Sequence, residues 1–340
     1  MGMIAPAYTI THPAYIMPEL LLPYAQASGA FDLLGGGEPM VRLSDNTLFA
    51  YIRRLDVRTK MAGGQATYNE LPSCEIVASM ISTPSYRIRV RAEYDHHDTA
   101  AAGEWGVSLP QAQRLAMRQG HFQLLRNMLL FGMNPANGEG LVNANGATAI
   151  NLPPDSNGNT TVLTYDNGQM TFFQLSQIAA LKSRTNQLGI GQDFVILGPQ
   201  RVLSVWEYQG IVQLVQFQRI GAGSNTTAGT TKEVLSWNGD KILWCYDDTL
   251  IGKGAGGTDL VILGMPEVEK PEESGINTNE FATLSPGLEA CTLMLTDMNA
   301  PREIPTPLAG GAIDVLSELR ATSGWGIRPE ALTLMSMAYQ

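Results

Sequence analysis

Residues that could carry chemistry are few in this chain, and the histidines are the first to consider. Two of the four histidines lie in the segment Asp95-His-His-Asp98, which contains residue types found in metal sites. Adjacent side chains on an extended segment point to opposite faces, so the two rings rarely reach one ion. We therefore interpret this segment as a polar turn after a strand. His121 falls within a predicted helix, where a packed or surface residue is favoured over a catalytic base.

Glycine and serine motifs for phosphate binding or nucleophilic catalysis are also incomplete. Segment 252–258 has glycines around Lys253 but lacks the spacing and the following hydroxyl of a phosphate loop. In the dinucleotide pattern that begins at Gly189, Phe194 stands where the third glycine belongs. Ser285 and Ser323 lack the flanking glycines of a nucleophile elbow. The sequence predicts no enzyme: we expect no catalytic residue, no cofactor and no metal.

Charged residues gather in two separate parts of the chain. The proline-flanked segment 266–274 is acidic, and nothing around it suggests the shaped cleft that the paired acids of a glycosidase need. The strand-like segments 48–60 and 85–95 are basic. One interpretation is a solvated surface with a charged edge that prevents aggregation. The other is contact between different copies of the chain. Under the second interpretation the contact residues are Arg53, Arg54, Arg58, Lys60, Arg87, Arg89, Arg91, Glu267, Glu269, Glu272 and Glu273.

Composition narrows the class of protein. The chain has 340 residues and a net charge of −10, and residues 1–41 contain no lysine or arginine. The strong basic footprint of a nucleic-acid-binding protein is missing. Three widely spaced cysteines, Cys74, Cys245 and Cys291, fit neither a disulfide framework nor a zinc site, which indicates a reducing compartment. Without a secretory signal or a long apolar run, we expect a soluble protein made in the cytoplasm, with no membrane partner.

The first part of the chain alternates between extended and helical patterns. Residues 1–43 contain five prolines among apolar residues, which predicts an extended arm that something else must cover. Strands are expected over 49–60 and 86–92, with Arg87, Arg89 and Arg91 on one face and apolar side chains on the other. Between them, 61–67 is the expected turn. A capped helix over 108–131, roughly 35 Å long, ends at Gly132.

The second part predicts an α+β domain with a mixed sheet. The long, Asn- and Gly-rich segment 134–168 is the candidate domain boundary. A second helix is expected over 171–186, with its capping box at Thr171, followed by a buried strand at 194–197. A further helix begins at Pro199. Strands are expected over 243–250 and 260–265 and, at the end of the chain, over 330–337. There is no internal repeat.

This order of parts resembles the major capsid proteins of tailed bacteriophages, which have the Hong Kong 97-like fold. The resemblance rests on the paired strands 48–60 and 85–95, on helix 108–131, on loop 132–143 with its Glu-Gly-Leu-Val-Asn ending, and on segment 324–329. It covers essentially the whole chain. It implies an N-terminal arm (1–43) and an extended loop (44–95). It also implies a peripheral domain with a long spine helix (96–168 and 300–340) and an axial domain (169–299).

The function implied by the resemblance is structural. Copies of the chain would form pentamers and hexamers of an icosahedral head that encloses double-stranded DNA without sequence-specific binding. The extended loop would lie across one neighbour and the arm would run beneath another. A separate scaffolding protein, a portal and decoration proteins are the implied partners, and the implied location is the virion, after assembly in the host cytoplasm.

Two features of some members of this family are not carried over to this chain. Lys60 is the only lysine in the extended loop and no acid is identifiable as a catalyst, so we do not predict crosslinking. Residues 1–43 are too short and too rich in proline to be a helical scaffolding segment that is cleaved off. The alternatives are an encapsulin, a nanocompartment of the same fold that encloses a cargo enzyme, and a cytoplasmic hydrolase with a dispersed active site.

Overall fold

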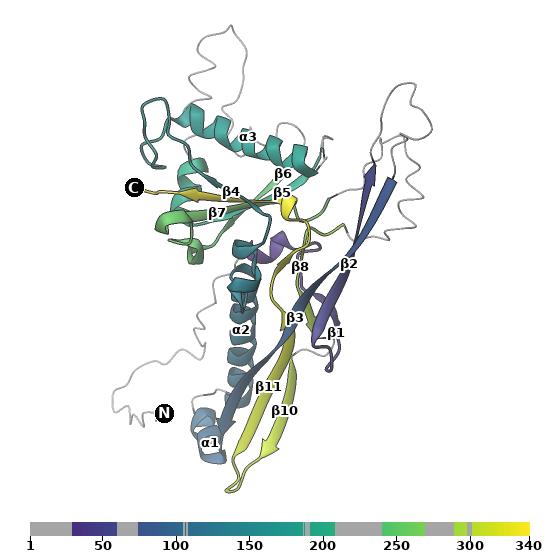
Figure 1. Cartoon of the computed structure of the whole chain (residues 1–340). Helices are drawn as coiled ribbons and strands as arrows, with labels where there is room; N and C mark the ends of the chain where they lie inside the picture. Colours follow the sequence, from purple (N-terminus) through teal and green to yellow (C-terminus); the bar gives the residue numbers. More distant parts are fainter. Residues whose placement is uncertain are drawn as a thin grey trace, which may run out of the picture.

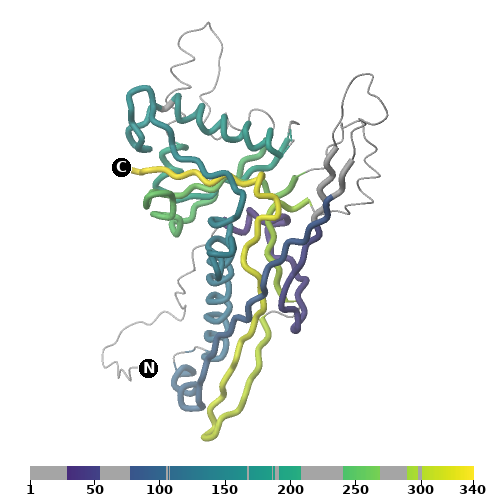
Figure 2. The backbone as a smooth tube through the Cα atoms, in the orientation of Figure 1, coloured from purple at the N-terminus to yellow at the C-terminus, as the bar shows by residue number. Residues whose placement is uncertain are grey.

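The computed structural model describes residues 29–59, 74–104, 106, 108–185, 187, 191–207, 240–268, 289–297 and 301–340. These residues form an elongated molecule in which the two larger of three β-sheets lie at different heights along one long helix, α2 (Figures 1 and 2). The expected arm up to residue 28, the expected turn at 61–67 and most of the acidic segment lie outside the described residues.

The described part of the chain combines helices and strands. The helices are α1 (His96–Glu104), α2 (Leu109–Leu130), α3 (Asn167–Thr185) and a helical segment at 200–207. The strands are β1 (Met40–Leu43), β2 (Phe49–Thr59), β3 (Cys74–Tyr94), β4 (Thr148–Asn151), β5 (Asp193–Gly198), β6 (Lys241–Tyr246), β7 (Asp259–Gly264), β8 (Thr292–Leu293), β9 (Leu295–Asp297), β10 (Arg302–Pro307), β11 (Ile313–Thr322), β12 (Trp325–Gly326) and β13 (Leu332–Met337). Short 3-10 turns include η1 (Gly29–Leu33).

A five-stranded sheet in the order β4-β13-β7-β5-β6 combines parallel and antiparallel pairs, as the sequence predicted. Its central strands β5 and β7 each contain four consecutive apolar residues, because both faces of the sheet are covered there. On β5, Phe194 and Ile196 pack into one cluster, whereas Val195 and Leu197 pack into another on the opposite face. This two-sided burial explains why the sequence at β5 and β7 reads as an uninterrupted hydrophobic run.

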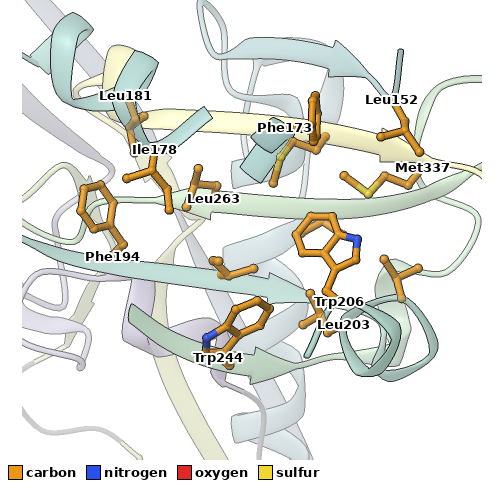
Figure 3. Packing of buried hydrophobic residues seen from close by; sticks show 14 of the residues in the cluster. Leu152, Phe173, Ile178, Leu181, Phe194, Leu203, Trp206, Trp244, Leu263 and Met337 are labelled. Atoms are coloured by element: carbon orange, nitrogen blue, oxygen red, sulfur yellow. The ribbon is translucent and has the colours of Figure 1, made fainter. Parts of the chain in front are cut away.

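The first of these clusters lies between the sheet and its helices (Figure 3). Ile178 and Leu181 of α3 approach the sheet from one side, and Trp206 packs edge-on against Trp244, with ring centroids 6.4 Å apart. Large rings in this geometry bury much apolar area, and each fully buried side chain contributes about 1.5–3 kcal/mol. This cluster fixes α3 on the sheet.

A second, six-stranded sheet runs along α2, with the path β1-β9-β11-β3-β2 and with β10 paired to β11. Strand β11 pairs with β3 over the whole of its length, from Ile313 opposite Tyr94 to Thr322 opposite Ser85. One face of this sheet lies against α2, where the ring Nε2 of buried His121 is 3.0 Å from Ser317 Oγ. The opposite face is open to solvent.

The C-terminal end of α2 is inserted between the two sheets. Met128, Leu129 and Leu130 are fully buried together with Leu33 of η1 and Leu332 of β13. Because this apolar helix end contacts both large sheets, one of the buried clusters joins the two parts of the molecule. The pairings also divide residues 301–340: β10 and β11 belong to the long sheet, and β13 is a central strand of the five-stranded sheet.

The long helix matches the prediction closely, but the expected capping box does not form. Ser108 occupies the N-cap position of α2 and Pro110 lies in the first turn, yet the Ser108 side chain makes no capping hydrogen bond. At the other end, Gly132 adopts the left-handed conformation with φ of 70°, which ends the helix as predicted.

One helix prediction was wrong at its start, and one turn prediction was wrong. Helix α3 begins at Asn167 rather than at Thr171, because Asp166 Oδ1 accepts hydrogen bonds from the backbone N–H groups of Gly168 and Gln169. The segment after β3 is not a turn but helix α1, which begins at His96. Asp95 accepts hydrogen bonds from the N–H groups of His97 and Asp98, and these bonds lower the pKa of its carboxyl group.

The bounds of one predicted strand also differ in the structure. The expected strand over 243–250 is shorter and earlier, because β6 ends at Tyr246 and Asp247 caps a 3-10 turn (Asp248–Leu250). Within the described part of the chain, no helix is long and apolar enough to cross a membrane.

Candidate assembly surfaces

The longest strand of the described chain, β3, pairs with different strands in its two halves. The second half of β3 lies in the long sheet beside β11, and its first half, 74–84, pairs only with β2 among the described elements. These two strands form a two-stranded ribbon that projects from the body of the molecule (Figure 1). We call β2 together with residues 74–84 the ribbon.

Hydrogen bonds hold the base of the ribbon at the point where β3 changes partner. The N–H of Ser85 donates to Leu48 O at 2.9 Å, and its hydroxyl donates to Thr47 O at 2.5 Å. Arg320 of β11 also donates to Thr47 O. Because the turn before β2 is bound to both β3 and β11, the direction of the ribbon is set by the long sheet.

One face of the ribbon exposes large apolar side chains. Phe49, Tyr51 and Met80 are 51%, 64% and 69% exposed, and the register places all three on the same face. The opposite face is covered at its base, where Ala50 packs with Leu43. An isolated two-stranded ribbon is marginal in water, and aromatic side chains are enriched at protein interfaces. This face has the character of a contact surface.

The loop that follows α2 is held by a buried carboxylate, that of Glu139. Its oxygens accept hydrogen bonds from Tyr86 Oη at 2.9 Å, from Ser323 Oγ at 2.9 Å and from the N–H of Asn134 at 3.1 Å. Burial, followed by the hydrogen bond to this carboxylate, raises the pKa of Tyr86 to about 12. Asn143 completes the loop by donating to Phe131 O and Glu139 O. The network connects β3, the end of α2 and the β11–β12 turn.

Glycines let the backbone segments of this junction touch. Gly140 has φ of 85°, and a Cβ atom there would overlap the backbone of Gly132 and Phe131. A Cβ atom at Gly324 would overlap Leu129 O in α2. Both positions therefore require glycine, and the loop forms a rigid connection between the helix and the two sheets.

The three arginines of β3 form a ladder on the solvent face of the long sheet, with strand β11 as their partner. Arg89 Nε lies 2.8 Å from Glu318, and Arg87 Nε lies 3.5 Å from the same carboxylate. Arg91 Nε is 2.8 Å from Asp314, and this hydrogen bond raises the pKa of Arg91. These side chains are roughly half exposed, so their intrachain ion pairs contribute little to stability.

Groups for catalysis do not converge in the described parts of the chain. No three His, Cys, Asp or Glu side chains are grouped there so that they could hold a metal ion. The buried thiols of Cys245 and Cys291 both have pKa values raised to about 12, chiefly by desolvation, so neither thiol is activated as a nucleophile.

Comparisons with known proteins depend on structure, since no protein-family model matches the chain and no curated protein matches its sequence. Solved structures do match. The capsid of Myoviridae phage XM1 is 11% identical, with a TM-score of 0.61 over 95% of this chain and 96% of that chain. The capsid of the native GTA particle is 9% identical, with a TM-score of 0.55 over 97% and 96%. The capsid of cyanophage P-SCSP1u is 10% identical, with a TM-score of 0.54 over 96% and 93%.

This chain has the Hong Kong 97-like capsid fold. The α+β fold class predicted from the sequence is therefore confirmed. The ribbon lies within the predicted extended loop (44–95), and α2 coincides with the predicted spine helix.

The structure places the predicted contact residues in different settings. Arg53 is exposed on the ribbon, on the same face as Tyr51 and Met80. Glu267 is exposed in the segment that follows β7, where it forms an isolated β-bridge with Ala290. The side chains of Arg54, Arg58, Lys60, Glu269, Glu272 and Glu273 lie outside the described part of the structure. That these residues contact another copy of this chain stays a prediction.

Sequence reasoning missed the residues that hold the junction behind α2. Glu139 begins the Glu-Gly-Leu-Val-Asn ending of loop 132–143, but nothing local in the sequence indicates that its side chain is buried, with 6% exposed. Its partners Tyr86 and Ser323 are 53 and 184 residues away in the chain. The available signal was an acid between two glycines directly after a helix, in a segment with no lysine or arginine to pair with it.

Proposed function

We propose that this chain is the major capsid protein of a tailed bacteriophage, and that copies of it assemble as pentamers and hexamers into an icosahedral head around double-stranded DNA. The observation that carries the proposal is the match to solved phage capsids over nearly the full length of both chains. The match to the first of these capsids covers 95% of this chain and 96% of that chain.

The ribbon supports this role on physical grounds. Its apolar face, on which Tyr51 and Met80 are 64% and 69% exposed, lacks a cover within the described chain. A neighbouring copy can supply that cover. Shells gain stability by adding many modest contacts, so each ribbon needs to contribute only a weak interface. The net charge of −10 also suits a DNA container, because a basic lining would bind the genome tightly.

The proposed head also includes partner proteins and specific contacts between subunits. A separate scaffolding protein, a portal and decoration proteins would complete the head, and assembly would take place in the host cytoplasm. The subunit itself would have no catalytic activity. Contacts between basic ribbons and acidic segments of different copies, including Arg53 and Glu267, would direct how subunits meet.

Electron microscopy and sedimentation of the expressed full-length chain test the proposal. A capsid protein is expected to give capsomers and closed shells of megadalton size. A small oligomer with hydrolase activity would contradict the proposal, and closed shells filled with one copurified cargo enzyme would favour the encapsulin alternative instead.

A deletion gives a sharper test of the ribbon. Removing residues 61–67, which lie between the two ribbon strands and outside the described residues, is expected to abolish shells while the chain still folds. Urea unfolding of the deletion variant checks the fold. Normal shells from this variant would contradict the role of the ribbon in covering a neighbour.

A further inference from the structure

The outer face of the spine helix carries an unusual side-chain pattern. Residues on one continuous stripe of α2 face away from both sheets, and the helix has a single charged side chain on that stripe. The stripe consists of Leu115, Ala116, Gln119, Phe122, Gln123 and Arg126. Leu115 and Phe122 are 42% and 39% exposed. An exposed helical face with apolar and amide side chains but few charges is unusual for a solvated helix.

Arg126 differs from the other arginines of this helix. Arg114 and Arg118 lie on the flank of α2 beside β10 and approach Glu303 at 2.9 and 4.0 Å. Within the described residues, Arg126 has no carboxylate partner, and its buried Nε has no hydrogen-bond acceptor. A guanidinium group partly withdrawn from water without an acceptor is costly. This position therefore calls for an anionic partner.

The described chain begins beside this stripe. Gly29 opens η1, and two residues later the ring of Phe31 contacts that of Phe122, with centroids 5.2 Å apart. The preceding residues, 1–28, therefore join the body of the molecule at the stripe itself. Figure 1 shows η1 against the upper part of α2.

The composition of residues 1–28 complements the stripe. This segment contains no lysine or arginine, is largely apolar, and has Glu19 as its only acidic side chain. Gly29 is ten positions after Glu19, and ten extended residue steps span up to about 33 Å. Arg126 lies one helical turn, about 6 Å, beyond Phe122. Glu19 is therefore within reach of Arg126.

We propose that residues 1–28 dock on the spine helix of their own chain, with apolar side chains over Leu115 and Phe122 and with Glu19 paired to Arg126. Attachment at Gly29 gives the segment a high effective concentration at the stripe of its own helix. The docked segment covers the apolar face and supplies the acceptor that Arg126 lacks among the described residues. This inference concerns the folded subunit, so its failure would leave the proposed capsid function untouched.

Chymotrypsin cleavage of the unassembled full-length chain measures docking directly, because residues 1–28 contain three tyrosines, Tyr8, Tyr15 and Tyr24. The variants E19R and R126E are each expected to speed cleavage in this segment about tenfold, since each removes a charged hydrogen bond and creates a like-charge pair. The double variant E19R/R126E is expected to restore the slow rate. R114E is the matched control on the same helix and is expected to leave the rate unchanged.

Several results would overturn the inference. Unchanged cleavage in E19R would do so even if R126E failed to fold, because Glu19 lies outside the described fold. A double variant that is cleaved as fast as the single variants would also do so. Mixing E19R chains with R126E chains separates docking within a chain from exchange between copies. Slow cleavage in that mixture would mean that the segment docks on a sister copy, which contradicts docking on its own helix.

Discussion

The hydroxyl of Tyr86 donates to both carboxylate oxygens of Glu139, at distances of 2.9 and 3.0 Å. Tyr86 is the second residue of β3 after the point where that strand leaves the ribbon and enters the long sheet. Glu139 belongs to the loop that follows α2. This pair therefore connects the base of the projecting ribbon to the loop at the end of the spine helix.

Replacing Glu139 by alanine is expected to lower the free energy of unfolding by about 3 kcal/mol, because three donors lose their acceptor in a buried site. Tyr86→Phe removes one donor and should cost only about 1 kcal/mol. Urea unfolding of the unassembled chain measures both values. Glu93→Ala, at an exposed position of the same strand, serves as the control. A Glu139→Ala variant as stable as the control would show that the network contributes nothing.

The raised pKa of Tyr86, about 12, predicts a loss of stability in alkaline solution. The unfolded chain ionises this tyrosine near pH 10, whereas the folded chain keeps it neutral. The stability that the neutral Tyr86 contributes to the fold is therefore fully present below about pH 10, and it is lost as the pH rises toward 12. Urea midpoints measured across this range should fall less steeply in Tyr86→Phe than in wild type. Tyr51→Phe, at an exposed site, should behave like wild type.

Two glycines in and after α2 should respond in opposite directions to alanine. Gly140→Ala forces a side chain onto the backbone of Phe131 at a positive φ and should cost more than about 3 kcal/mol. Gly120 lies within α2, and a Cβ atom there meets nothing within 4 Å. Gly120→Ala should therefore stabilise the chain by roughly 0.5–1 kcal/mol through helix propensity. Thermal unfolding distinguishes the two, and a stabilising Gly140→Ala would refute the close approach.

His121 predicts acid sensitivity of the contact between α2 and the long sheet. Burial lowers its pKa, and its Nδ1 has no partner within the described residues. Its Nε2 is 3.0 Å from Ser317 Oγ, and Ser317 pairs across the sheet with Glu303, which forms an ion pair with Arg114.

The folded chain therefore resists protonation of this ring, and stability is lost as the pH falls below about 6.5, the value for unfolded histidine. Urea midpoints at pH 7.5 and 5.5 should differ less in His121→Gln than in wild type. His97→Gln, at the exposed start of α1, is the control. Equal pH dependence in both variants would exclude His121 as the cause.

The apolar face of the ribbon can be removed without touching the core. In the variant Tyr51→Ser/Met80→Ser both changes lie at exposed positions, so the unfolding free energy should stay within about 0.5 kcal/mol of wild type. If a neighbour covers this face, each interface loses about 1.5–3 kcal/mol per side chain. The lowest protein concentration that gives shells in light scattering should then rise at least about tenfold. Leu163→Ser, exposed on a loop, is the control, and equal assembly of both variants would argue against a covered ribbon.

Local patterns in the sequence were sufficient for the main elements and their order. Periodicity and a terminal glycine gave α2 to within one residue at each end, and alternation placed Arg87, Arg89 and Arg91 on one face of β3. These features depend on neighbours within a few positions along the chain, which the sequence shows directly. The sequence predicts a turn where α1 forms and a start at Thr171 for α3, whereas in the structure Asp95 and Asp166 accept hydrogen bonds from N–H groups in the first turn of the two helices.

The tertiary structure alone decided which residues these elements meet. Arg89 pairs with Glu318, 229 positions away, and Glu139 is buried by Tyr86 and Ser323, which come from two other parts of the chain. A side chain's own sequence neighbourhood fixes its face on a strand or helix. The partner across that face depends on how distant strands and helices pack, and the free energy of that packing is shared over the whole core.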